Sequence, residues 1–247
     1  MKLTFLGTRG NIEARTRRHG MHSSMRVSYY DTEIIIDCGE DWLGEIDGWE
    51  ADGIVVTHAH PDHAFGLREG APCPVFATEA AWETMEDFAI EERRTVPERR
   101  PLQIGGAGGG PGIGLEAFPV LHSTRAPAVG YRLSAGRVDI FYVPDVAWIE
   151  DRESALSGVR LYVGDGATIK RSMVRKPGDV IIGHVPIQTQ LTWCRKLEVS
   201  RAIFTHLGSE IVEGDERVLG AEIRRLAEER DVQRVDIAHD GMEVVLR

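Results

Sequence analysis

The stretch Thr57-His58-Ala59-His60-Pro61-Asp62-His63 gathers three histidines and an aspartate directly after the apolar run Ile54-Val55-Val56. Alternate side chains of an extended chain share a face, so His58 and His60 can hold one metal ion together. Pro61 is expected to end the strand, after which Asp62 and His63 face another direction and suit a second ion. Packing alone gives no reason to gather four titratable groups here, because burying them is costly without a metal or charged partners. The stretch therefore predicts a metal site.

Length and composition set the class of protein. The chain has 247 residues, of which 42% are hydrophobic and 28% charged, as in ordinary globular proteins. This excludes disorder, coiled coil and collagen-like repeats, and predicts a single domain over residues 1–247. The apolar runs are far shorter than the roughly 20 residues of a membrane span. The N-terminus lacks the apolar run of a secretory signal, so we expect a cytoplasmic protein without a membrane partner.

The charge balance bears on whether the protein binds nucleic acid, and the cysteines bear on whether it has disulfides or a Cys-based metal motif. Lys and Arg number 29 and Asp and Glu number 39, a formal net charge of −10. This sign opposes phosphate neutralisation, so nucleic acid is expected to be an unlikely partner. The three cysteines have no short spacing between them, which predicts reduced thiols rather than disulfides or a Cys-based metal motif.

Hydrophobic periodicity predicts a β-rich chain with a few helices. Strands are expected at 2–6, 24–29, 33–36, 53–57, 115–119, 128–133, 138–143, 161–163, 180–182, 235–238 and 242–246. Helices are expected to begin at Ala64 and to cover 78–94, 187–197 and 215–230. Each half runs from strands to helices and back to strands, which indicates two packed sheets with helices outside. The glycine-rich stretch Gly105–Gly114 has no P-loop lysine and is expected to be a connector without chemistry.

The motif His58-x-His60-x-Asp62-His63 resembles the signature of the metallo-β-lactamase superfamily. The resemblance implies an α/β fold, a four-layer αββα sandwich, with two bound metal ions. It assigns His122 to the first ion with His58 and His60, and His206 to the second ion with Asp62 and His63. Asp145 matches the carboxylate that bridges both ions, with Asp165 as its rival. Asp37 matches an acid that supports the metal-binding loop.

Two branches of the superfamily resemble further parts of the chain. Gly183-His184 is similar to the Gly-His that tRNase Z and a phosphonate-pathway cyclic phosphodiesterase place opposite the metals to bind or protonate a phosphate. Several short stretches, such as Gly164–Thr168 and Ala238–Met242, resemble the pyrroloquinoline-quinone biosynthesis protein B. That branch lacks the complete metal motif and carries a Cys-rich segment that is absent here. The complete ligand set therefore favours hydrolysis.

These observations predict a dinuclear metal-dependent hydrolase in which hydroxide held by two divalent ions attacks a small phosphodiester or cyclic phosphate. Zinc is favoured, with manganese and iron as alternatives. Asp62 and His184 are the expected catalytic residues, and His22 is a weaker candidate. The rival hypotheses are an iron-dependent oxidoreductase related to quinone-cofactor biosynthesis, a tRNA 3′-processing nuclease and a non-catalytic metal-bound scaffold. A homodimer is compatible with the sequence.

Overall fold

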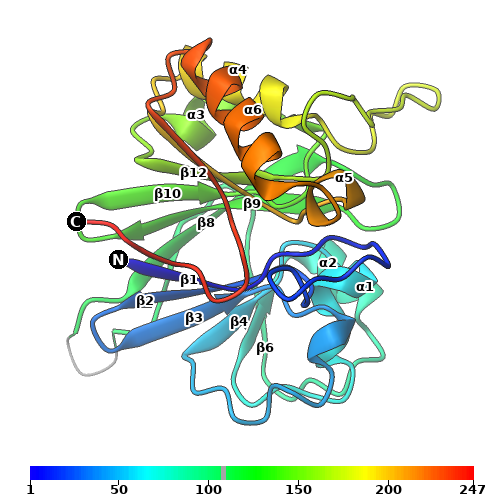
Figure 1. Ribbon diagram of the computed structural model, residues 1–247. Coiled ribbons are helices and arrows are strands. Elements are labelled where there is room, and N and C mark those ends of the chain that lie inside the picture. Colours follow the sequence, from blue (N-terminus) through cyan, green and yellow to red (C-terminus); the bar gives the residue numbers. More distant parts are fainter. Residues whose placement is uncertain (107–109) are drawn as a thin grey trace.

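Two mixed β-sheets pack face to face in this computed structural model, which describes residues 1–106 and 110–247 (Figure 1). The first sheet has seven strands in the order β15-β1-β2-β3-β4-β5-β6. These strands are β1 Lys2–Gly7, β2 Ser24–Tyr29, β3 Thr32–Ile36, β4 Gly53–Val55, β5 Val75–Ala77, β6 Arg93–Thr95 and β15 Glu243–Val245. Strands β3 to β6 run parallel to one another, and β15, β1, β2 and β3 pair antiparallel.

The second sheet has eight strands, seven of them in the order β11-β8-β9-β10-β12-β13-β14, with β7 paired to β8. They are β7 Leu102–Ile104, β8 Ile113–Leu121, β9 Ala128–Ala135, β10 Val138–Tyr142, β11 Trp148–Ile149, β12 Leu161–Asp165, β13 Arg201–Thr205 and β14 Arg234–Ile237. Its strands β10, β12, β13 and β14 are parallel neighbours.

Short helices cover the outer faces of both sheets. They are α1 Pro61–Ala64, α2 Glu79–Thr84, α3 Arg152–Leu156, α4 Ile187–Lys196, α5 Ser209–Val212 and α6 Glu216–Glu228, with 3-10 turns at Glu40–Trp42 and Phe65–Leu67. In Figure 1, α3, α4 and α6 lie on the outer side of the second sheet. No helix among the described residues is both long and apolar enough to cross a lipid bilayer.

Three layers of apolar side chains hold this arrangement together. Between the sheets, Phe5 and Val27 pack with Tyr131 and Ile140. Ile35 points to the other face of the same strand as Ile34 and Ile36, and packs with residues of α1 and α2. A third cluster joins the second sheet to α4 and α6. The predicted four-layer αββα sandwich is confirmed, because each sheet is buried on both faces.

Two predicted elements are wrong. The helix expected over 78–94 ends at Thr84, and Arg93–Thr95 instead forms the parallel edge strand β6 beside β5. The chain must reverse between them, and Phe88 and Ile90 still pack into the core as their apolar character predicts. The strand expected at 180–182 has no sheet partner; only Ile182 forms an isolated bridge, to Arg175, and Val180 is 44% exposed. Part of the connector expected at Gly105–Gly114 lies outside the described residues.

Candidate metal centre

All the sequence-predicted ligands follow the C-terminal ends of strands and therefore meet at one edge of the sandwich. The loop 57–63 follows β4, His122 follows β8, Asp145 follows β10 and His206 follows β13. His58 and His60 were expected on the strand. The strand β4 ends at Val55, so both histidines lie in the loop that follows it. Pro61 begins α1 and does not end a strand, because its fixed φ suits the first helical position. Asp62 and His63 therefore project from the first turn of that helix.

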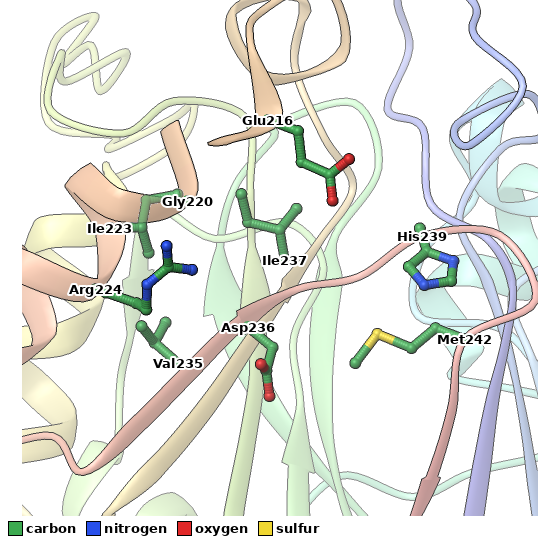
Figure 2. Close-up of a pocket in the computed structure, with 9 residues that line it drawn as sticks. All are labelled: Glu216, Gly220, Ile223, Arg224, Val235, Asp236, Ile237, His239 and Met242. Carbon is green, nitrogen blue, oxygen red and sulfur yellow. The ribbon is translucent and has the colours of Figure 1, made fainter. Parts of the chain in front are cut away.

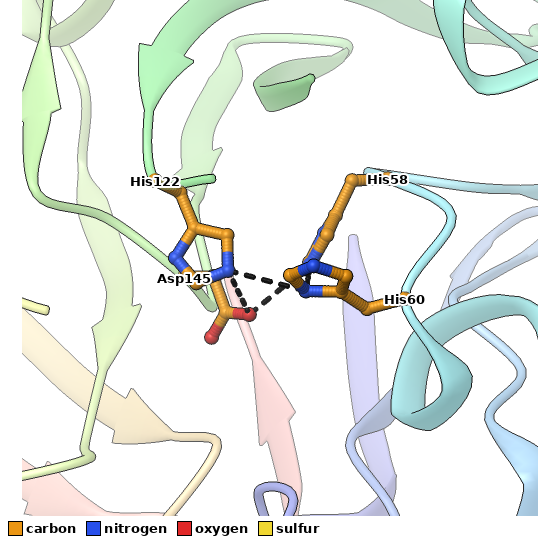
Figure 3. A group of neighbouring side chains, drawn as sticks. All are labelled: His58, His60, His122 and Asp145. Carbon is orange, nitrogen blue, oxygen red and sulfur yellow. Dashed lines mark hydrogen bonds and ion pairs between the residues drawn. The ribbon is translucent and has the colours of Figure 1, made fainter. Parts of the chain in front are cut away.

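Three histidines and one carboxylate form the first donor group, His58, His60, His122 and Asp145 (Figure 3). The Asp145 Oδ2 atom lies 3.2 Å from His58 Nε2 and 3.3 Å from His122 Nε2. His60 Nδ1 lies 3.0 Å from His58 Nε2 and 3.3 Å from His122 Nε2. Four donor atoms thus converge on one point, as a tetrahedral metal site requires.

A second donor group shares Asp145 and adds Asp62, His63 and His206. Asp62 Oδ2 lies 3.0 Å from His206 Nε2 and 3.4 Å from His63 Nε2. Asp145 contributes to this group through both oxygens, with Oδ2 3.2 Å from His63 Nε2 and Oδ1 2.7 Å from His206 Nδ1. Asp145 therefore occupies the position that a bridging carboxylate needs.

Asp37 supports the loop from behind. Its fully buried carboxylate accepts hydrogen bonds from the Thr57 amide and hydroxyl at 2.8 and 2.9 Å and lies 2.9 Å from His63 Nδ1. Burial raises the pKa of Asp37 although these groups oppose the shift. Because the contact with Asp37 engages Nδ1 of His63, the imidazole presents Nε2 to the donor group. The support expected of Asp37 is therefore present in the structure.

The unsatisfied atoms in this cluster fit a metal. Among the described residues, His63 Nε2, His206 Nδ1 and Asp145 Oδ1 are buried without a hydrogen-bond partner of acceptable geometry. Such buried orphan atoms are rare in proteins, and a cation would satisfy all three. Nitrogen and oxygen donors in groups of four also suit zinc and its first-row neighbours.

Electrostatics within the cluster are strongly coupled. Burial lowers the pKa of His206, but the Asp145 and Asp62 carboxylates together outweigh burial and raise that pKa to about 10. Burial, and next the neighbouring His122, lower the pKa of His60 to about 4. Without a cation the cluster thus needs protons on some of its imidazoles to balance the buried carboxylates.

His184 and Asp165 form a pair beside the two donor groups. His184 Nδ1 lies 2.8 Å from Asp165 Oδ2 and 3.8 Å from Asp145 Oδ1. Asp165 also accepts hydrogen bonds from the Val146 and Ala167 amides at 3.0 and 2.9 Å. Burial lowers the pKa of His184, but Asp165 and Asp145 together outweigh burial and the net shift is upward. Asp165 thus orients His184. Both lie outside the two donor groups described above, but together with Asp145 and His206 they form a third group of possible metal ligands.

Among the described residues, His22 belongs to no donor group, although Asp62 and His63 lie close enough to influence its pKa. Its side chain is 2% exposed, and Nδ1 lies 3.2 Å from Asp41 Oδ2, in a cluster with the buried Arg9. Burial, and then the Arg9 cation, lower the pKa of His22 to about 4.

Gly10 is part of the site's surroundings that was not predicted from the sequence. Its backbone lies against the His206 ring: a Cβ added there would be 3.0 Å from His206 Cε1. Nothing in the local sequence signals that contact.

A cavity of about 450 Å³ opens beside the donor groups, with His184 and His206 in its lining. Its other lining residues include Ile12, Thr168, Arg171, Met173 and Ser209. A different pocket, of about 250 Å³, lies between α6 and β14 (Figure 2) and contains none of the donor residues. The first cavity is the one placed to receive a reacting molecule.

Comparisons with known proteins identify the family and the fold. A family model described as "Beta-lactamase superfamily domain" matches residues 32–207. A ribonuclease Z from Methanopyrus kandleri is 26% identical over 181 residues, which cover 65% of this chain and 61% of that protein. The chain thus spans about three fifths of the length of this curated relative.

Two solved structures share the fold. The metallo-beta-lactamase fold protein YhfI from Bacillus subtilis superposes with a TM-score of 0.74 at 16% identity, covering 98% of both chains. Zn(2+)-bound PqqB from Methylobacterium extorquens gives a TM-score of 0.69 at 18% identity, covering 100% of both chains. At these sequence identities, the two structures show only that the fold is shared. The predicted resemblance to the superfamily is confirmed by the family model, the chain is similar to a ribonuclease Z, and PqqB shares its fold.

Proposed function

Since this chain belongs to the β-lactamase superfamily, we propose that it is a dinuclear metal-dependent hydrolase that cleaves a phosphodiester bond. The first ion would be held by His58, His60, His122 and Asp145, and the second by Asp62, His63, Asp145 and His206. When bound, the two ions would polarise a phosphoryl oxygen and lower the pKa of a water molecule. Zinc is the favoured ion because the donor sets mix imidazole with carboxylate.

One observation carries the assignment to phosphodiesters: His184 stands beside both proposed ion sites and belongs to neither of their donor groups, although it also groups with Asp145, Asp165 and His206. The Nδ1–H of its ring donates to Asp165, and the neighbouring carboxylates raise the pKa of the ring, so His184 can carry a second proton on Nε2 that is available to a reacting group. That proton can go to the leaving oxygen, or can form a hydrogen bond that stabilises the charge growing on the phosphoryl group. Asp62 would orient the attacking water by accepting a hydrogen bond from it.

Two substrates that differ in size are candidates. A cavity of about 450 Å³ suits a small phosphodiester or cyclic phosphate, the preferred substrate. The expectation that nucleic acid is an unlikely partner has no support, because the matched relative carries the name ribonuclease Z. An RNA phosphodiester is therefore the second candidate, and a substrate panel should contain both.

The first test is metal analysis combined with turnover. Protein purified without added metal is expected to contain two divalent ions per chain by elemental analysis and to hydrolyse bis-p-nitrophenyl phosphate. The His184→Ala variant should keep both ions and lose about 10²- to 10⁴-fold in turnover, the usual range for a general acid. The matched control is His239→Ala, because His239 lines the pocket of Figure 2 and not the metal centre. Near-wild-type turnover in His184→Ala would contradict the assigned role.

Leaving groups separate the two roles of His184. If His184 donates the proton, His184→Ala should reduce turnover less for an ester whose leaving group is p-nitrophenolate than for one whose leaving group is an alkoxide. Equal losses would indicate charge stabilisation instead. Running the same assays without oxygen tests the iron-dependent oxidoreductase hypothesis, since hydrolysis needs no oxidant.

A further inference from the structure

The chain between β12 and α4 contains an arm, residues 170–183, that extends away from the sheets in Figure 1. Two backbone hydrogen bonds of 2.9 Å join its limbs at Arg175 and Ile182. At its base, the Met173 amide donates to the His184 carbonyl at 3.0 Å, and the Gly183 amide donates to the His122 carbonyl at 2.8 Å. The base of the arm is thus bonded to a predicted metal ligand and to the predicted proton donor.

The first limb of this arm is basic in an acidic protein. It carries Lys170, Arg171, Arg175 and Lys176, whereas the formal net charge of the chain is −10. Lys170 forms an ion pair with Glu222. Across residues 1–106 and 110–247, the other three cations take part in no ion pair, and all three side chains are exposed. Unpaired cations that gather next to a reaction centre favour an anionic ligand.

Arg171 is the cation that reaches the cavity. It lines the cavity together with Met173, His184 and His206. The one carboxylate in the same lining is Glu210, which already accepts hydrogen bonds from the Ile169 amide at 3.1 Å and the Thr168 hydroxyl at 3.3 Å. The guanidinium of Arg171 is therefore free to bind an anion, and its planar set of donors matches phosphate.

We propose that the arm forms an anion subsite in which Arg171 binds a second, non-reacting phosphate of the substrate. Arg175 and Lys176 then bind phosphates farther along a longer chain. This inference rests on the proposed phosphodiester hydrolysis and specifies its substrate: a phosphodiester that carries at least one more phosphate. Both a nucleoside bisphosphate ester and a short single-stranded oligonucleotide have that chemistry.

The first experiment compares thymidine 5′-(p-nitrophenyl phosphate) with and without a 3′-phosphate. Wild-type protein should prefer the 3′-phosphorylated substrate in kcat/KM. In Arg171→Ala the ratio between the two substrates should fall about 10- to 100-fold, the loss expected for hydrogen bonds to a charged group. The matched control is Arg137→Ala, an exposed arginine in the turn between β9 and β10. An unchanged ratio in Arg171→Ala would overturn the subsite.

A second experiment separates the two sources of the extra phosphate. The variant Arg175→Ala/Lys176→Ala should weaken cleavage of a single-stranded oligonucleotide and reduce its salt dependence by a slope of about 1.4, since each cation neutralises one phosphate. The control Arg137→Ala/Lys196→Ala removes two exposed cations elsewhere. Unaltered oligonucleotide cleavage would overturn the part assigned to Arg175 and Lys176 and restrict the substrate to bisphosphates.

Binding without turnover distinguishes the failure of this inference from the failure of the proposed function. Calorimetry with thymidine 3′,5′-bisphosphate should show tighter binding than with thymidine 5′-monophosphate, and Arg171→Ala should remove the difference. That result without any hydrolysis would refute the proposed function and leave the subsite standing. If the protein hydrolyses phosphodiesters but Arg171→Ala leaves its preference for the bisphosphate unaltered, the subsite would be refuted and the proposed function would stand.

Discussion

Asp145 joins the two halves of the metal centre at the scale of single residues. Its side chain is 3% exposed, and Oδ2 contacts imidazoles of both donor groups. A buried carboxylate surrounded by histidines is costly unless a cation compensates it. Asp165, the rival in the sequence, is instead hydrogen-bonded to His184 and two backbone amides. The bridging role of Asp145 remains a prediction that these contacts favour.

Asp62→Ala should abolish hydrolysis while keeping the fold. The substitution removes a carboxylate that contacts both His63 and His206, so the content of the second ion should fall and the loss should lie mainly in kcat. Elemental analysis and steady-state kinetics with bis-p-nitrophenyl phosphate check this. The control Asp87→Ala removes an exposed carboxylate in the turn that follows α2. If Asp62→Ala turned over like wild type, the proposed mechanism would be wrong.

Gly10→Ala should weaken binding of the second ion. A Cβ at this position would lie 3.0 to 3.2 Å from three atoms of the His206 ring, so the imidazole must shift. Displaced support of a ligand typically costs 10- to 100-fold in metal affinity. Calorimetric titration of stripped protein with Co²⁺, followed by its absorption spectrum, should show this loss at one of the two sites. Gly220→Ala, where the new Cβ meets only the flexible end of Arg224, should bind as wild type does.

The cysteines should react slowly in the native protein. Burial raises the pKa of Cys73 to about 11 and also raises the pKa values of the buried Cys38 and Cys194. Only the thiolate reacts, so a raised pKa leaves little nucleophile at pH 8. Labelling of half-buried Cys73 should accelerate about tenfold per pH unit up to its pKa, whereas unfolded protein should release all three thiols at once. Rapid labelling of three thiols in native protein would contradict these environments.

The helix α6 allows a test at the scale of an element. Its N-cap Asp215 accepts hydrogen bonds from the Arg217 and Val218 amides at 2.9 and 3.3 Å. Asp215→Ala should lower the free energy of unfolding by about 1 kcal/mol, because these amides lose their partner. Urea denaturation followed by circular dichroism measures the change. Arg217→Ala, on the same exposed turn, serves as control and should change stability far less.

Elements were predictable where their pattern was long and local. The strands β2 and β9 and the helices α4 and α6 follow their periodicity within a few residues. The strands β5, β6, β7 and β11 were not predicted, because a run of two or three residues carries no period. The five-residue strand β13 was not predicted either. The β-branched run at 180–182 favours a strand by propensity, but among the described residues it joins neither sheet and Ile182 only forms an isolated bridge with Arg175.

The candidate site was predictable to a similar extent. The ligand loop is compact in sequence, so its motif could be read directly. The partners that depend on tertiary packing, such as Asp165 for His184 or Gly10 for His206, come from segments far apart in the chain. No spacing rule in a single sequence contains that information.

At the scale of the whole molecule, the donor groups join the two sheets. The residues of the loop 57–63 follow β4 of the first sheet, while His122, Asp145 and His206 follow strands of the second. Bound ions would therefore cross-link the sandwich at one edge. The ions would also compensate the charge of the buried carboxylates in the cluster.

Removing the ions should consequently lower stability. Protein stripped with a chelator should melt at a lower temperature, and zinc should restore the midpoint with saturation at two ions per chain. Linkage predicts about 2.7 kcal/mol for each site at a free zinc concentration a hundredfold above its Kd. Scanning calorimetry at several zinc concentrations checks this, with His239→Ala as a variant that should respond as wild type does. Identical melting of stripped and zinc-loaded protein would argue against ions in the cluster.

The order of the donor residues along the chain has a consequence for biosynthesis. The first donor group is complete in sequence once Asp145 has been added, whereas the second also needs His206, which follows α4 and β13. A polypeptide that stops anywhere between these two residues carries every side chain of the three-histidine group and only part of its neighbour. On the ribosome, the ligands of the first group are therefore all synthesised before those of the second, and the second ion site is completed last.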